Sequence, residues 1–178
     1  MRRTAEGDGE AFAVLVRRWE GRVARVLAPL APRPQDVEDL RQEAFLRVLA
    51  ASGRYRSQGA FSTWLFRIVL NLARDEARRR KRRPENLGEA VIGQSNGAPP
   101  DEATRRELVQ CVASALDALP AELREALVLK HYGELTFAEM SDVLRTPAST
   151  LKSRVALAHR RLRSELHRRG VRDADVEP

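Results

Sequence analysis

The sequence predicts an all-α protein made of two small helical domains joined by a flexible linker. Apolar residues recur at spacings of three and four along most of the chain, the period of one helix face, and few segments show the period of two that indicates a strand. Between Pro84 and Pro100 the chain is rich in Gly, Pro, Ser and Asn, which favour turns. We therefore expect an N-terminal domain over residues 1–83, a linker over 84–101, a C-terminal domain over 102–170 and a tail over 171–178.

The N-terminal domain is expected to contain three helices. Apolar residues line one face from Phe12 to Leu30, where a proline-rich segment ends the first helix. Asp36 is a suitable N-cap for the second helix, because its side chain can accept hydrogen bonds from the N–H groups of the first turn. The third helix has apolar residues from Trp64 to Leu72 and ends in the basic run Arg78–Arg83. Such a run suits the solvated C-terminus of a helix, and it equally suits contact with phosphates.

Four helices are expected in the C-terminal domain. Pro120 ends the first, and the second runs from Ala121 to about His131 with Gly133 as a C-cap residue. Thr136 and Glu139 have the Thr-x-x-Glu spacing of a capping box, which starts the short third helix. A break at residues 145–147 precedes the longer fourth helix.

Two helices joined by a turn of three or four residues, the second of them basic, have the pattern of a helix-turn-helix. We assign this motif to Thr136–Leu166, where Glu165 is the only acidic residue between Ala148 and Gly170. The alternative is a solvated basic helix on a helical bundle. In helix-turn-helix proteins the start of the second helix enters the major groove. Its outward residues there are Ser149, Lys152, Ser153 and Ala156, while Arg154 and Arg160 could hold phosphates.

Composition narrows the classes of function. A net charge of +7 and a pI of about 10.6 favour a polyanionic partner, either nucleic acid or an anionic membrane surface. Cys111 is the only cysteine and the histidines are not at ligand spacing, so we expect neither a metal site nor a cofactor. No apolar run approaches the length of a membrane span or a signal peptide, so we expect a cytoplasmic protein.

The helix that begins at Asp36 has an acidic and polar face inside an otherwise basic domain. This face would repel DNA and is expected to point elsewhere. It is either an ordinary solvated face or a docking surface for a basic protein. Its members are Glu38, Asp39, Gln42 and Glu43.

Three aromatic residues, Tyr55, Phe61 and Trp64, flank a polar loop next to the basic third helix. Aromatic residues at helical spacing usually belong to a core. In this setting they could also stack against an unpaired base.

Several separated segments, in this order, resemble the sigma factors of bacterial RNA polymerase. The run Asp36–Val48 is similar to the helix that binds core polymerase, and Tyr55–Ala73 is similar to the segment that opens promoter DNA. Leu116–Pro120 and Leu151–Arg154 resemble the C-terminal promoter-reading domain. The small two-domain size resembles the extracytoplasmic-function (ECF) group of the sigma-70 family.

The resemblance implies a transcription initiation factor and not an enzyme, with core RNA polymerase (its beta-prime and beta subunits), promoter DNA and an anti-sigma factor as partners. It implies binding of polymerase through Asp36, Glu38, Asp39, Leu40, Gln42, Glu43 and Phe45. It implies recognition of the −10 element, with capture of a flipped base, through Tyr55, Arg56, Ser57, Gln58, Gly59, Phe61, Trp64, Arg67, Asn71, Arg74 and Arg78. It implies reading of the −35 element as duplex through Ser149, Thr150, Lys152, Ser153, Arg154, Ala156 and Arg160.

Two other classes of protein explain less of the sequence. A helix-turn-helix repressor or activator would account for Thr136–Leu166 equally well, but not for Asp36–Val48 or Phe61–Leu72. A small hydrolase or nucleotidyl transferase would need paired carboxylates beside a histidine, a Gly loop for phosphate or metal-ligand spacing, and the sequence shows none of these.

Overall fold

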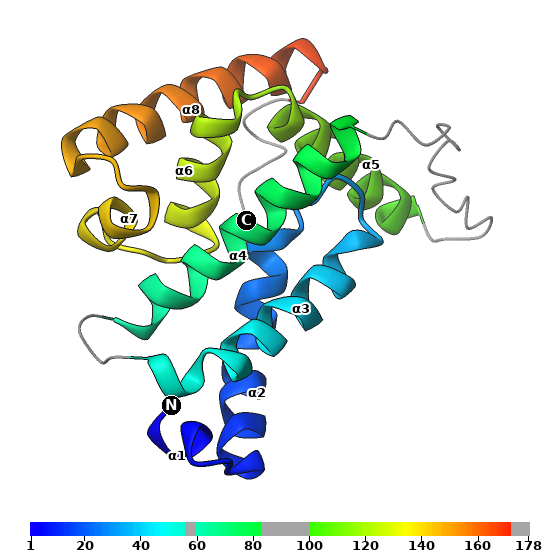
Figure 1. Ribbon diagram of the computed structural model, residues 1–178. Coiled ribbons are helices and arrows are strands. Elements are labelled where there is room, and N and C mark those ends of the chain that lie inside the picture. Colours follow the sequence, from blue (N-terminus) through cyan, green and yellow to red (C-terminus); the bar gives the residue numbers. More distant parts are fainter. Residues whose placement is uncertain (56–59, 83–99, 172–178) are drawn as a thin grey trace.

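The computed structural model describes residues 1–55, 60–82 and 100–171. These residues form eight α-helices and one short 3-10 helix without any strand, so the all-α prediction is confirmed (Figure 1). The predicted linker lies outside the described residues except for its last two positions, and the predicted tail lies outside them except for Val171.

The N-terminal unit comprises α1 to α4. Three long helices were predicted and are present as α2 (Gly9–Leu27), α3 (Asp36–Ala50) and α4 (Phe61–Arg82), which pack against one another. Two short elements were not predicted: α1 (Arg2–Ala5) and the 3-10 helix η1 (Ser52–Arg54), which contact each other. Asp8 caps α2 by accepting a hydrogen bond of 2.9 Å from the backbone N–H of Ala11.

The predicted role of Asp36 as an N-cap is wrong. Gln35 occupies the N-cap position of α3, without a side-chain cap bond, and Asp36 is the first helical residue. The Asp36 side chain turns inward, with 8% of the residue exposed, and its Oδ1 accepts from Arg80 at 2.9 Å and from Arg33 at 3.4 Å. It therefore ties the start of α3 to the end of α4, because a buried carboxylate needs cationic or N–H partners.

The C-terminal unit contains the four predicted helices: α5 (Pro100–Asp117), α6 (Ala121–His131), α7 (Phe137–Leu144) and α8 (Ala148–Arg168). Helix α5 begins within the last two residues of the predicted linker. At the start of α7 the capping box is present in full, with Thr136 accepting from the Glu139 backbone and Glu139 accepting from the Thr136 backbone.

Gly133 has a different role from the one predicted. The C-cap position of α6 is Tyr132, and the left-handed residue is Glu134, with a φ of 49°. A Cβ at Gly133 would lie 2.6 Å from the carbonyl oxygen of Leu129. Glycine is required here because the chain folds back tightly against α6, which is a matter of space and not of backbone angle.

The two units share one hydrophobic core. Buried residues of α2, α3 and α4 and buried residues of α6, α7 and α8 belong to a single connected cluster. Helix α4 is the element that joins them, since it packs against α2 and α3 and also against α7. Figure 1 shows α4 crossing the middle of the molecule between the two units.

Candidate nucleic-acid and polymerase interfaces

Helices α7 and α8 form the predicted helix-turn-helix. The turn contains Arg145 in the left-handed region, with φ 52° and ψ 45°, and Pro147 occupies the N-cap position of α8. Met140, Leu151 and Ala158 are completely buried. Packing of α8 against both α6 and α7 fixes its inward face and thereby leaves the opposite face of its first turns in solvent.

Of the residues predicted to read the −35 element, one is half-buried and the others are exposed. Arg154 is half-buried, and its guanidinium lies 2.8 Å from the carboxylate of Glu122 on α6. The Lys152 ammonium lies 5.9 Å from the ring centroid of Phe137, which Lys130 also approaches at 5.0 Å. The exposed members are Ser149, Thr150, Lys152, Ser153, Ala156 and Arg160. A cation over an aromatic face is attracted to it electrostatically.

A pair of histidines lies beside this surface. The Nε2 atoms of His131 on α6 and His159 on α8 are 2.9 Å apart, with the rings nearly perpendicular. Burial, followed by the proximity of His159 and Lys130, lowers the pKa of His131. The neutral form of His131 is therefore favoured.

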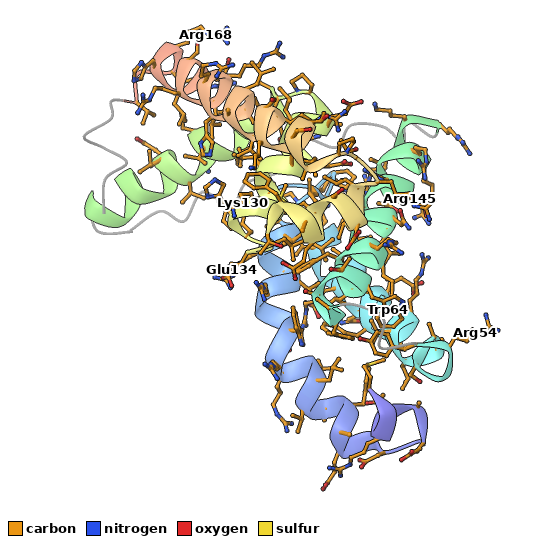
Figure 2. The ribbon with its side chains drawn as sticks, turned by 90° about the vertical axis from the view of Figure 1, so that its left-hand side faces the viewer. Arg54, Trp64, Lys130, Glu134, Arg145 and Arg168 are labelled. Carbon is orange, nitrogen blue, oxygen red and sulfur yellow. The ribbon has the colours of Figure 1, made fainter. Side chains whose placement is uncertain are left out.

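The predicted aromatic cluster is present at the start of α4. Tyr55 contacts Trp64 edge-on with ring centroids 5.0 Å apart, and Phe61 contacts Trp19 of α2 at 5.3 Å. All four side chains are partly buried. They therefore pack against the core and keep part of their surface in solvent. The predicted contacts Arg56, Ser57, Gln58 and Gly59 lie outside the described residues. Figure 2 shows Trp64 on the first turns of α4.

The polar residues predicted on α4 have unequal surroundings. Asn71 is exposed. Arg67 donates to the backbone oxygen of Asp142 at 2.9 Å, and Arg74 forms two hydrogen bonds with Glu125. Both partners belong to the C-terminal unit. In the basic run, Arg78 pairs with Asp75, while Arg79 and Arg80 pair with Glu76.

Helix α3 presents the predicted acidic face, but much of its charge is already paired. Glu38 accepts from Arg41 at 2.6 Å and from Gln42 at 2.8 Å, and these bonds lower the pKa of Glu38. Glu43 pairs with Arg47 at 2.8 Å. Asp39 is exposed and has no hydrogen-bond or ion-pair partner among the described residues.

The other residues predicted to bind polymerase lie behind this face. Leu40 and Phe45 are buried in the core, as is Asp36, so they support α3 from below. Sequence reasoning missed Leu46, which lies one helical turn from Gln42 and has 59% of its surface exposed. Its signal was an apolar residue at an outward position of the helix.

The described residues were also searched for a metal-binding group and for a membrane-spanning helix. They contain no group of three or more histidine, cysteine, aspartate or glutamate side chains placed to hold a metal ion. None of their helices has the length and apolar character needed to cross a bilayer.

The two units match two parts of one family. Residues 15–83 match the model described as Sigma-70 region 2, and residues 109–162 match that described as Sigma-70, region 4. The chain is 33% identical over 165 residues to the ECF RNA polymerase sigma-E factor of Escherichia coli K12, covering 87% of this chain and 86% of that protein. It is 28% identical to the namesake from Haemophilus influenzae, with 93% of each chain covered.

Solved structures agree with this result. The structure of CnrH in complex with the cytosolic domain of CnrY has a TM-score of 0.72 and 27% identity, over 93% of this chain and 94% of that chain. The sigma factor RpoE of Bartonella quintana, in complex with the anti-sigma factor NepR, has a TM-score of 0.73 at 21% identity, over 89% of this chain and 98% of that chain, and shows the shared fold.

A region 2 unit followed by a region 4 unit, with an exposed basic helix in the second, is the architecture of a promoter-directing subunit of bacterial RNA polymerase. The chain belongs to the sigma-70 family of sigma factors, in its extracytoplasmic-function group. The predicted family is thus confirmed.

Proposed function

We propose that this sigma factor contacts promoter DNA through α4 and the first turns of α8, and core polymerase through the outer face of α3. The observation that carries this assignment is the exposed polar surface at the start of α8, on a helix-turn-helix whose inward face is fixed by packing. A division of 1–83, 84–101, 102–170 and 171–178 remains our proposal for the domain boundaries.

The −35 element would be read by the six exposed residues of α8 listed above. Ser149, Lys152 and Ser153 lie within the first two turns, the part of a recognition helix that meets base edges. Arg160 lies farther along the exposed side and would contact a phosphate. We assign Arg154 a positioning role, because its guanidinium is engaged by Glu122.

The −10 element would be bound by the N-terminal unit. Partly exposed Tyr55, Phe61 and Trp64 offer aromatic surface for an extruded base, and stacking on such rings stabilises single strands by about 1–3 kcal/mol per base. The proposed contacts include Arg56, Ser57, Gln58 and Gly59, which lie outside the described residues. On α4 the proposed contacts are Arg67, Asn71, Arg74 and Arg78.

The polymerase surface would be centred on Asp39 and Gln42, with Glu38, Glu43 and Leu46 around them. Asp39 supports this assignment because it has no ion-pair partner in the part of the chain that the structure describes, so that its charge can attract a basic partner. Leu46 supplies an exposed apolar contact beside the charge.

Other parts of the function follow from the polymerase partner. The chain would act without catalytic residues of its own, since the chemistry belongs to the polymerase. It would act in the cytoplasm, where its partner works. We also propose an anti-sigma factor as a further partner, because two solved relatives are described in complexes, one of them with a named anti-sigma factor.

Reconstituted transcription tests this proposal. The purified chain should give promoter-specific initiation only together with core polymerase. The proposal would be contradicted if the chain bound promoter DNA tightly by itself and had no effect on core polymerase.

Replacing Asp39 and Gln42 together with Ala should weaken binding to core polymerase in a pull-down without lowering the melting temperature, because both side chains are exposed. Glu10→Ala, on the exposed side of α2, is the matched control. Equal binding of the wild type, the double variant and Glu10→Ala to core polymerase would contradict the proposed α3 surface.

A further inference from the structure

The histidine pair between α6 and α8 belongs to neither of the proposed interfaces. His131 is the last residue of α6, His159 lies in the middle of α8, and both side chains are exposed. Their Nε2 atoms are 2.9 Å apart and the planes of the rings meet at 84°. A neutral imidazole carries its lone pair on the nitrogen that lacks the proton. Both Nε2 atoms can therefore bind one and the same ion when the two protons are on Nδ1.

The positions of the two rings are set by the core of the C-terminal unit. Helix α6 packs against α8, and Leu129 and Ala158, close to the two histidines in the sequence, are completely buried. Both backbones are thus held before any ion arrives. Ligands that are already in place lose little freedom on binding, which favours a chelate of only two side chains.

The distance between the two nitrogens suits a transition-metal ion. Imidazole nitrogens bind such ions at about 2.0–2.1 Å, so two of them at right angles on a square-planar or octahedral ion lie about 2.9 Å apart. Tetrahedral coordination, which is usual for Zn²⁺, would separate them by about 3.3 Å. The observed 2.9 Å matches the first arrangement, which is that of Ni²⁺ and Cu²⁺.

We propose that the Nε2 atoms of His131 and His159 chelate one divalent transition-metal ion of the Ni²⁺ and Cu²⁺ type, with water in its other positions. The site is open, because no third histidine, cysteine, aspartate or glutamate of the described residues completes it. In the metal-free protein one Nε2–H donates to the other Nε2. On binding, that proton moves to Nδ1 by exchange with solvent, so two neutral rings release no net proton. The ion joins α6 to α8 beside Arg160, and this inference is independent of the proposed contacts with polymerase and DNA.

Lys130 limits the affinity of the site. It precedes His131 in the last turn of α6 (Figure 2), and its ammonium donates to the backbone oxygen of Leu135 at 3.2 Å. A nearby positive charge disfavours a bound cation. Two ligands with such a neighbour predict an affinity in the micromolar range, weaker than that of a closed structural site.

Titration of the full chain, free of any affinity tag, with NiCl₂ tests the proposal. Calorimetry at a pH of about 7.5, where histidine is mostly neutral, gives the stoichiometry and the Kd. Thermal denaturation with and without the ion gives the shift of the melting temperature. His131→Gln and His159→Gln each remove one ligand and keep a polar side chain. His167→Gln is the matched control, because His167 is also exposed and lies more than two turns beyond His159 on the same helix.

The wild type should bind one Ni²⁺ per chain. Its melting temperature should rise by about 5 °C at an ion concentration of about 100 times the Kd, because the folded arrangement binds the ion better than the unfolded chain does. His131→Gln and His159→Gln should each raise the Kd at least about tenfold and lose most of the rise, whereas His167→Gln should keep both. Comparing each variant with and without Ni²⁺ separates metal binding from any effect of the substitution on folding.

Three results would overturn the proposal. The first is a wild type that binds no Ni²⁺ at micromolar to millimolar concentration. The second is an equal rise of the melting temperature in the wild type and His131→Gln, or its loss in His167→Gln, since the ion would then bind elsewhere on the chain. The third is an equal rise with Mg²⁺, which prefers oxygen ligands, because a general effect of ionic charge would then explain the result.

Discussion

The capping box at the start of α7 allows a direct test of how the helix-turn-helix is held. Thr136→Ala removes one hydroxyl, which accepts from the Glu139 backbone at 3.2 Å and donates to the Glu139 carboxylate at 2.8 Å. The bond from the Thr136 backbone N–H to the same carboxylate, 2.9 Å long, remains. Thr136 is exposed, so no cavity results, and the loss should be that of an N-cap, about 1 kcal/mol.

Thermal denaturation followed by circular dichroism measures this loss. For a chain of this length about 1 kcal/mol lowers the melting temperature by about 2–4 °C. Thr150→Ala is the matched control, because it removes an exposed threonine hydroxyl from the first turn of α8, whose N-cap position makes no side-chain bond. An unchanged melting temperature for Thr136→Ala, or an equal drop for Thr150→Ala, would refute the reasoning.

The capping box also predicts that the stability of the protein depends on pH. Hydrogen bonding from the Thr136 backbone is the largest cause that lowers the pKa of Glu139 below 4.5, against the effect of burial. A folded pKa below the unfolded one means that the carboxylate stabilises the fold fully above the unfolded pKa, and that this contribution disappears as the pH falls through the folded pKa. The stability gap between wild type and Glu139→Gln should therefore be full at neutral pH and close in acid.

Two further predictions concern single residues. Lys152→Ala should weaken binding of the holoenzyme to promoters by an amount that depends on the −35 sequence, about 1–3 kcal/mol at the best site, and an equal loss on all −35 variants would make Lys152 a phosphate contact. Gly133→Ala should destabilise the protein by about 1–3 kcal/mol in denaturant unfolding, because its Cβ would clash with the backbone of Leu129. Gly53→Ala, where nothing lies within 4 Å, should be nearly neutral, and a similar loss at both glycines would contradict the steric argument.

Much of the fold was predictable because its signals are local. Pro120, the Thr136–Glu139 spacing and the break at residues 145–147 act within a few residues of themselves, and α6, α7 and α8 begin where these signals indicate. Asp36 shows the limit of such reasoning. An acidic residue at the start of a helix has the composition of an N-cap, but a cation from α4, which is distant in sequence, draws it inward.

In the candidate site, the exposed face of α8 was predictable from the sequence, whereas contacts between distant helices were not. The outward face of α8 follows from helical periodicity, and its exposure agrees with that. The pairing of Arg74 with Glu125 does not follow from any local pattern, because both residues look like ordinary surface charges until the two units are brought together. The same holds for His131 and His159, which approach each other only through the packing of α6 on α8.

The single hydrophobic core has a consequence for how the molecule melts. Both tryptophans, Trp19 and Trp64, lie in the N-terminal unit, whereas the capping box lies in the C-terminal unit. Since buried residues of both units form one connected cluster, local damage at α7 is shared by the whole chain instead of fraying one half. A substitution at Thr136 should then shift the unfolding transition measured by tryptophan emission, although both tryptophans lie in the other unit.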